Sequence, residues 1–134
     1  MFDPNTKILI VDDMLTMRKI VKKIFRDLGF TNITEAHDGK DAWEKVQTGN
    51  FGLIMSDWNM PVCSGLDFLK MVRSDKNLAK TPFILVTAEA EQHQVAEAIK
   101  SGVDNYVVKP FSQEALKLKL EATHKKITIR NSAQ

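Results

Sequence analysis

The sequence has 134 residues, of which 43% are hydrophobic and 27% are charged, a balance typical of one soluble globular domain rather than a disordered chain. The single cysteine, Cys63, excludes an internal disulfide framework and a zinc site built from several cysteines, and it fits a reducing, cytoplasmic setting. With a net charge of +2, scattered basic residues, only short apolar runs and no signal-like N-terminus, we expect no nucleic-acid binding, membrane insertion or export.

Short apolar runs alternate with stretches of helical periodicity in the first half of the chain. Residues 7–11 predict a buried strand, and residues 31–36 predict a second, weaker one. Between them, residues 15–28 predict a helix that ends at Gly29. Its apolar residues recur every three or four positions and are expected on one face: Met17, Ile20, Val21, Ile24, Phe25 and Leu28. A helix over residues 40–48, stopped by Gly49, follows.

The second half continues the alternation. Strands are predicted over residues 51–56, 83–87 and 105–108, and helices after Gly65, over residues 91–101 and after Ser112. In the helix over 91–101, Val95, Ala98 and Ile99 are expected to face inward. Residues 125–134 are expected to form a frayed tail. Strand and helix thus alternate five times, which predicts an α/β fold with a parallel sheet and helices on both faces, as one domain spanning residues 1–134.

Chemically capable side chains follow several of these strands. Asp12 and Asp13 come after the first strand, Asp57 ends the third, Thr87 ends the fourth, and Lys109 follows the fifth. Ligands of such sheets bind beyond the carboxyl ends of the strands, so these five side chains are expected to meet at one edge.

Three carboxylates brought within about 5 Å would repel one another by roughly 3 kcal/mol per pair at an effective dielectric near 20. The ammonium of Lys109 or a divalent cation could offset this repulsion. Oxygen ligands without histidine or cysteine favour Mg²⁺. A carboxylate beside Mg²⁺ and a lysine can attack phosphorus to form an aspartyl phosphate, with the Thr87 hydroxyl donating a hydrogen bond to a phosphoryl oxygen.

The same residues carry a family resemblance. Together with the segments 56–61 (SDWNMP), 86–90 (VTAEA) and 106–111 (YVVKPF), they resemble the receiver domains of two-component response regulators, and within that family the chemotaxis regulators. The resemblance extends over residues 6 to about 124. It implies a flavodoxin-like (βα)5 three-layer sandwich whose five-stranded parallel sheet has the order 2-1-3-4-5, an order known for that family.

The resemblance also implies individual roles around the aspartates. Asp57 would be the phosphoacceptor. Asp13 and Asp57 would bind Mg²⁺ directly, together with the backbone carbonyl of Asn59, whereas Asp12 would act through a metal-bound water. Lys109 would pair with the phosphoryl group.

Further implied roles concern signalling. Thr87 would hydrogen-bond the phosphoryl group, and Tyr106 would be an aromatic switch that turns inward when Thr87 is drawn to it. A plain aromatic on an edge strand is the competing interpretation of Tyr106. Asn59 and Glu89 would tune the lifetime of the phosphorylated state, and the peptide bond between Lys109 and Pro110 would be cis.

The implied partners are those of chemotaxis. A CheA-like histidine kinase would donate the phosphoryl group, and the phosphorylated form would bind the flagellar switch protein FliM and control rotation, with a phosphatase as a further partner. The partner surface would comprise Ala90, Val95, Ile99, Val103, Phe111 and Lys119. Because the chain ends soon after the last predicted helix, a stand-alone, monomeric receiver is expected.

Two other functions remain open from the residues. The receiver could pass its phosphate along a relay to a histidine phosphotransfer protein. Alternatively, an aspartyl phosphate could be the intermediate of a phosphatase, but such enzymes use a second aspartate two residues after the nucleophile. Here that position is Asn59, which cannot act as an acid.

Overall fold

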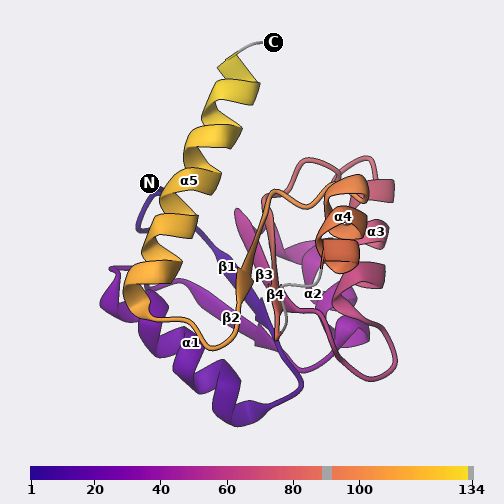
Figure 1. Ribbon diagram of the computed structural model, residues 1–134, viewed down its shortest axis with the longest axis horizontal. Coiled ribbons are helices and arrows are strands. Elements are labelled where there is room, and N and C mark those ends of the chain that lie inside the picture. The colour runs from indigo at the N-terminus through magenta and orange to yellow at the C-terminus, as the bar shows by residue number, and fades with distance from the viewer. Residues whose placement is uncertain (89–91, 133–134) are drawn as a thin grey trace.

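The computed structural model describes residues 1–88 and 92–132, and its centre is a five-stranded parallel sheet (Figure 1). The strands are β1 (Ile8–Val11), β2 (Ile33–Ala36), β3 (Leu53–Asp57), β4 (Phe83–Thr87) and β5 (Asn105–Val108). Their spatial order is β2-β1-β3-β4-β5, and each neighbouring pair is parallel. The predicted flavodoxin-like order is therefore confirmed.

Helices cover both faces of this sheet (Figure 1). They are α1 (Leu15–Asp27), α2 (Gly39–Gly49), α3 (Gly65–Ser74), α4 (Gln92–Lys100) and α5 (Gln113–Ser132). Helices α1 and α5 lie on one face, and α2, α3 and α4 lie on the other, so the molecule is a three-layer sandwich. The five predicted strand–helix units are all present.

Each face of the sheet has its own hydrophobic core because side chains alternate along a strand. On β1, Ile8 and Ile10 point to the α1–α5 side, while Leu9 and Val11 point to the α2–α4 side. All four are at most 2% exposed. A strand buried on both faces needs apolar residues at every position, which is why the central strands appear in the sequence as unbroken apolar runs.

Several element ends differ from the sequence prediction. The second strand begins at Ile33 rather than residue 31, and the third spans Leu53–Asp57 rather than residues 51–56. Helix α2 contains Gly49, and the residue that ends it is Asn50, in a left-handed conformation with φ 52°. Asparagine tolerates this conformation better than most residues, so it replaces glycine as the stop.

Three apolar residues lie elsewhere than predicted. Ile20 was expected in the core but is 48% exposed, and Ile99 was expected inward but is 63% exposed. A helix on a sheet buries only a narrow stripe, here centred on Val21 and Phe25 in α1, and residues at the edge of the stripe stay in solvent. Conversely, Val103 was expected at the partner surface, but it is 6% exposed and belongs to the core beneath α4.

The C-terminal segment does not fray as expected. Residues 125–132 continue α5, whose last turns extend past the rest of the molecule in Figure 1. Leu116, Leu120, Thr123 and Ile127 recur every three or four positions on its buried face. This repeat extends the core contact one turn beyond the expected end of the helix, which explains why the segment stays ordered.

Polar contacts fix the same segment. Asp104, at the start of β5, has a side chain only 2% exposed, and one of its oxygens lies 3.1 Å from Nη1 of Arg130. Its other oxygen accepts hydrogen bonds from Nη2 of Arg73 at 2.9 Å and from the backbone N–H of Phe83 at 2.8 Å. The Asp104 carbonyl oxygen accepts a bond from Nζ of Lys126 at 3.2 Å. These bonds tie α5 to α3 and to the beginnings of β4 and β5.

Among the described residues, no helix combines the length and the apolar character that crossing a membrane would require.

Candidate functional site

The carboxyl ends of β1 and β3 bring the predicted aspartates together. Val11 and Ser56 are register partners, so Asp12 and Asp57, which follow them, lie side by side. Both are buried, at 3% and 8% exposure, while Asp13 is exposed. One carboxylate oxygen from each of the three residues lies within 4.8 Å of the others. The structure therefore contains the predicted acidic cluster, with one ligand open to solvent.

Lys109 reaches this cluster from the end of β5. Its Nζ lies 3.1 Å from Oδ2 of Asp57 and 3.4 Å from Oδ2 of Asp12. The backbone N–H of Lys109 donates to the carbonyl oxygen of Thr87 at 2.7 Å, which fixes the start of the following loop against β4. The peptide bond between Lys109 and Pro110 is cis, as the resemblance implied.

Burial and charge shift the pKa values of this pair. Burial raises the pKa of Asp57 above its ordinary value, and the ammonium of Lys109 only partly counteracts this effect. For Lys109, burial favours the neutral amine, but the charges of Asp57 and Asp12 outweigh it and raise the pKa. Lys109 is therefore a firmly charged ammonium, whereas the ionised form of Asp57 is disfavoured by its surroundings.

The donor set fits a hard divalent cation. Three carboxylates face one ammonium, which leaves the cluster with two uncompensated negative charges in a largely buried place. Only oxygen atoms are offered, and Asp13 gives access from solvent. Mg²⁺ prefers such ligands and keeps several waters, which an open site allows.

The backbone around Asp12 is held in place by hydrogen bonds. Oδ1 of Asp12 accepts from the N–H of Met14 at 2.9 Å, which turns the chain from β1 into α1. The Asp12 carbonyl oxygen accepts from Nη1 of Arg18 at 2.7 Å, and its N–H donates to the carbonyl oxygen of Ala36 at 3.1 Å. Because both ends of the residue are fixed, the carboxylate oxygen that faces Lys109 keeps one orientation.

A glycine lets the chain pass close to Asp57. A Cβ atom on Gly65 would lie 2.1 Å from the carbonyl oxygen of Asp57, far inside van der Waals contact. The Gly65 N–H donates to the carbonyl oxygen of Trp58 at 2.8 Å, which closes the loop between β3 and α3. From the sequence, Gly65 was expected only to precede a helix. Its position eight residues after a strand-end aspartate gave no sign of this contact.

The loop between Asp57 and α3 also contains a strained residue. Val62 has φ 70° and is 85% exposed, and the N–H of Cys63 donates to the carbonyl oxygen of Pro61 at 2.7 Å across it. A β-branched residue rarely adopts this left-handed conformation. The predicted metal ligand and tuning residue Asn59 lies in the same loop and is exposed.

The predicted switch residues lie on one face of the sheet. Leu85 pairs with Tyr106 in the register of β4 and β5, and Thr87 lies two residues beyond Leu85, so the side chains of Thr87 and Tyr106 point to the same side. Thr87 is 4% exposed, and its Oγ1 donates to Oε1 of Gln94 on α4 at 3.3 Å. Nothing in the sequence identified Gln94 as its partner.

Tyr106 is half-buried and packs against the core on the α2–α4 side. The Nζ atom of Lys119, on α5, lies 4.7 Å from the centre of its ring, a cation–π arrangement. Of the predicted partner surface, Ile99 is exposed, while Val95, Phe111 and Lys119 are half-buried. Val103 is buried and does not belong to this surface, and Glu89 and Ala90 lie outside the described residues.

Comparison with known proteins identifies the family. The model of the response regulator receiver domain matches residues 8–121. The chemotaxis protein CheY of Pseudomonas aeruginosa is 50% identical over 121 residues, which cover 90% of this chain and 98% of that protein. CheY-3 of Vibrio cholerae is also 50% identical, over 117 residues, covering 87% of this chain and 90% of that protein. The predicted resemblance to chemotaxis receivers is confirmed.

Comparison with solved structures supports the same family assignment. The chemotaxis response regulator CheY4 of Vibrio cholerae superposes with a TM-score of 0.83 at 34% identity, covering 89% of this chain and 98% of that chain. The receiver domain of sensor histidine kinase PA1611 from Pseudomonas aeruginosa has a TM-score of 0.80 at 25% identity, covering 92% and 98%, and holds a magnesium ion in its active site cleft. This chain belongs to the response regulator receiver domain family.

Proposed function

We propose that this protein is a receiver of a chemotaxis-type two-component system, in which Asp57 accepts a phosphoryl group from a CheA-like histidine kinase. The observation that carries the proposal is the arrangement of Asp12, Asp13 and Asp57 around the ammonium of Lys109. The 50% identity to CheY proteins supports the chemotaxis assignment. Mg²⁺ would be held directly by Asp13, Asp57 and the backbone carbonyl of Asn59, with Asp12 acting through a metal-bound water.

In the proposed reaction, a carboxylate oxygen of Asp57 attacks the phosphorus of a phosphohistidine. The P–N bond breaks, its electron pair goes to the imidazole nitrogen, which takes up a proton, and an acyl phosphate remains on Asp57. The ammonium of Lys109, 3.1 Å from Asp57, neutralises charge on the phosphoryl oxygens. When bound, Mg²⁺ supplies further charge neutralisation and orientation. Attack by water on the acyl phosphate ends the signal.

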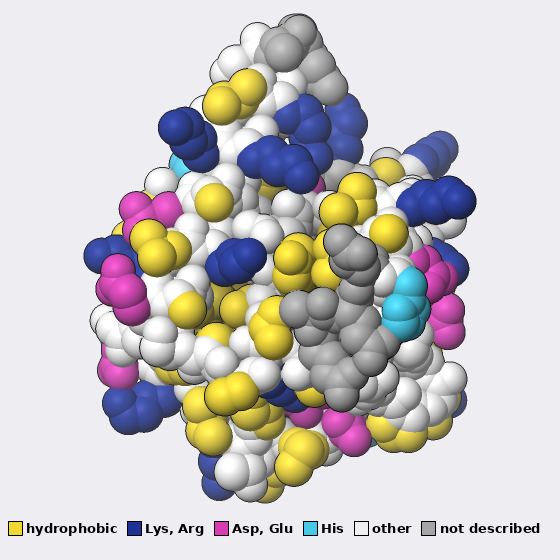
Figure 2. Space-filling model, in the orientation of Figure 1, with side chains coloured by type: hydrophobic (Ala, Val, Ile, Leu, Met, Phe, Trp, Pro, Cys, Tyr) yellow, Lys and Arg dark blue, Asp and Glu magenta, His cyan; other side chains and the backbone are white. Residues whose placement is uncertain are grey.

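The output would arise from Thr87 and Tyr106. In our proposal, the Thr87 hydroxyl exchanges its bond to Gln94 for one to the phosphoryl group, and Tyr106 turns into the space this opens. The face formed by α4, β5 and α5 then changes shape. Figure 2 shows hydrophobic side chains gathered between α4 and α5 on this face. Ile99 on α4 is 63% exposed. FliM would bind there and alter flagellar rotation.

Phosphorylation can be tested with acetyl phosphate as the donor. We expect Mg²⁺-dependent labelling of the protein that Asp57→Asn abolishes and EDTA suppresses. The matched control is Asp67→Asn, which removes an exposed carboxylate on α3 and should label normally. Labelling of the Asp57→Asn protein at the level of the unsubstituted protein would overturn the assignment of the phosphoacceptor.

The partner can be tested separately with beryllofluoride, which mimics the phosphoryl group. We expect beryllofluoride to increase retention of the protein on an immobilised FliM peptide, and expect no increase on a histidine phosphotransfer domain. The reverse result would replace the motor assignment with a phosphorelay while leaving the role of Asp57 intact.

A further inference from the structure

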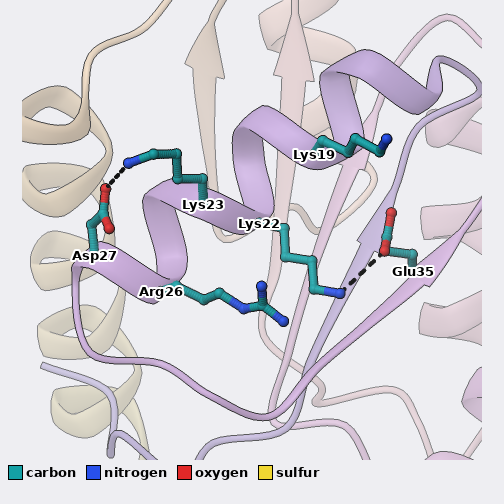
Figure 3. A pocket seen from close by; sticks show the side chains of 6 residues that line it. All are labelled: Lys19, Lys22, Lys23, Arg26, Asp27 and Glu35. Carbon is teal, nitrogen blue, oxygen red and sulfur yellow. Dashed lines mark hydrogen bonds and ion pairs between the residues drawn. The ribbon is translucent and has the colours of Figure 1, made fainter.

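A second charged surface lies on α1, and none of its residues belongs to the aspartate cluster. A groove between α1 and β2 is lined by Lys19, Lys22, Lys23, Arg26, Asp27 and Glu35 (Figure 3). The four basic residues lie at positions i, i+3, i+4 and i+7 of the helix, so they share one face. They span about 10 Å along the helix axis.

This surface, which we call the α1 basic groove, carries more positive charge than its own acids neutralise. Lys22 lies 3.4 Å from Glu35 on β2, and Lys23 lies 2.8 Å from Asp27 at the end of α1. Figure 3 shows both contacts. Within the described residues, Lys19 and Arg26 make no ion pair. Two cations therefore remain available to a ligand from outside.

An exposed apolar side chain lies on α1 beside its basic face, outside the residues that line the groove. Ile20 is 48% exposed, although its position in α1 was expected to be buried. At 100° of rotation per residue it lies next to the edge formed by Lys19 and Lys23. The surface thus offers several positive charges and, beside them, one aliphatic side chain.

The mixed charges favour a protein ligand over a polyphosphate. A nucleic acid or an anionic membrane presents closely spaced negative charges, which would meet Glu35 and Asp27 as well as the lysines. An acidic protein segment can place its carboxylates opposite Lys19 and Arg26 and avoid both acids. The existing ion pairs are partly exposed, and such pairs contribute little stability, so their partners can be exchanged at small cost.

We propose that the α1 basic groove is a docking site for an acidic protein segment that carries an apolar side chain. Its carboxylates bind Lys19 and Arg26, and its apolar side chain covers Ile20. Because the groove shares no residue with the aspartate cluster, docking does not require phosphorylation of Asp57.

The test uses the full chain and a fluorescent 12-residue probe peptide of alternating Glu-Glu and Leu-Leu pairs, with a matched peptide in which every Glu is Gln. We expect binding of the acidic peptide, amide shifts in ¹⁵N spectra confined to residues 19–26 and 35, and affinity that falls as salt rises. The double variant Lys19→Gln with Arg26→Gln should weaken binding about fivefold. The control, Lys117→Gln with Lys125→Gln on α5, removes equal charge from exposed positions and should bind as the unsubstituted chain does.

Other outcomes would overturn the proposal. Equal weakening in the α5 control would mean that net charge alone attracts the peptide, and equal binding of the Gln peptide would mean that carboxylates are not recognised. Tighter binding of phosphatidylserine vesicles or of a short DNA duplex through the same residues would assign the groove to a different class of ligand. Addition of beryllofluoride should leave the affinity for the acidic peptide unchanged. If the peptide bound only in the presence of beryllofluoride, the groove would not be independent of Asp57.

Discussion

Asp57 illustrates how a residue can serve chemistry at a cost to folding. It is 8% exposed, lies beside Asp12, and has one ammonium as its counter-charge. Its raised pKa shows that the fold disfavours the ionised carboxylate. An ionised group in this state is a good nucleophile and metal ligand because its solvation is incomplete. We therefore expect that, when nothing is bound, the ionised carboxylate of Asp57 lowers the stability of the folded protein.

Removing this charge should stabilise the protein. In EDTA at pH 7, we expect Asp57→Asn to raise the free energy of unfolding by about 1–2 kcal/mol, measured by urea denaturation. Because the folded-state pKa is raised, Asp57 lowers stability as pH rises above the unfolded-state value of 3.8. The gain should therefore shrink as pH falls toward 3.8 and vanish below it, where both states bind the proton. Asp67→Asn, on the surface of α3, serves as the control, and an equal gain there would contradict this explanation.

Val62 stores strain in the loop that follows Asp57. Its φ of 70° is unfavourable for a β-branched side chain, and at 85% exposure it gains little from packing. We expect Val62→Asn to raise the free energy of unfolding by about 1 kcal/mol, since asparagine tolerates positive φ. Val62→Thr keeps the branch and should give no gain, and a similar gain from both substitutions would mean that polarity rather than φ is responsible.

At the scale of single residues, the side chains that carry the chemistry could be predicted from the sequence, whereas the contacts that support them could not. Asp12, Asp57 and Lys109 were predictable because parallel strands place their carboxyl ends at one edge. The bond from Thr87 to Gln94 and the approach of Gly65 to Asp57 depend on how elements pack. No local pattern in the sequence encodes such contacts, so they could not be predicted from it.

At the scale of an element, helix α5 likewise has features that could be predicted from the sequence and one that could not. Its start and its type were predictable from caps and periodicity, but its end was not, because residues 125–132 carry many charges and resemble a solvated tail. What orders them is tertiary: Ile127 enters the core, and Arg130 reaches the buried carboxylate of Asp104. Propensity alone cannot supply this stabilisation.

Two isoleucines in this segment provide a matched test. Ile127 is 9% exposed and Ile129 is 60% exposed, and they lie two residues apart on the same helix. We expect Ile127→Ala to lower the free energy of unfolding by about 2–3 kcal/mol, and Ile129→Ala by less than about 0.5 kcal/mol. Urea denaturation followed by circular dichroism measures both. A small loss at Ile127 would indicate that the last turns of α5 do not pack as described.

At the scale of the whole molecule, the function we propose requires that the buried cluster at one edge of the sheet be coupled to the face formed by α4, β5 and α5. The connection consists of Thr87, which borders the cluster and bonds α4, and Tyr106, which contacts the core below α4 and the ammonium of Lys119 on α5. In the proposed switch, Thr87 would leave Gln94 for the phosphoryl group and Tyr106 would turn inward, each by a change of rotamer. A two-state element of this kind is what couples distant sites, because each site can shift its equilibrium.

Such coupling must act in both directions. If beryllofluoride at Asp57 raises affinity for a FliM peptide by some factor, the peptide must raise affinity for beryllofluoride by the same factor, since both belong to one thermodynamic cycle. We expect a factor of about 5–150, measurable by titrating beryllofluoride with and without saturating peptide and following the fluorescence of Trp58, the half-buried residue next to Asp57. Thr87→Ala, which removes the hydroxyl that borders both sites, should lower the factor toward one while leaving Mg²⁺ affinity largely intact. If the variant retains the full factor, the coupling passes through other residues than Thr87.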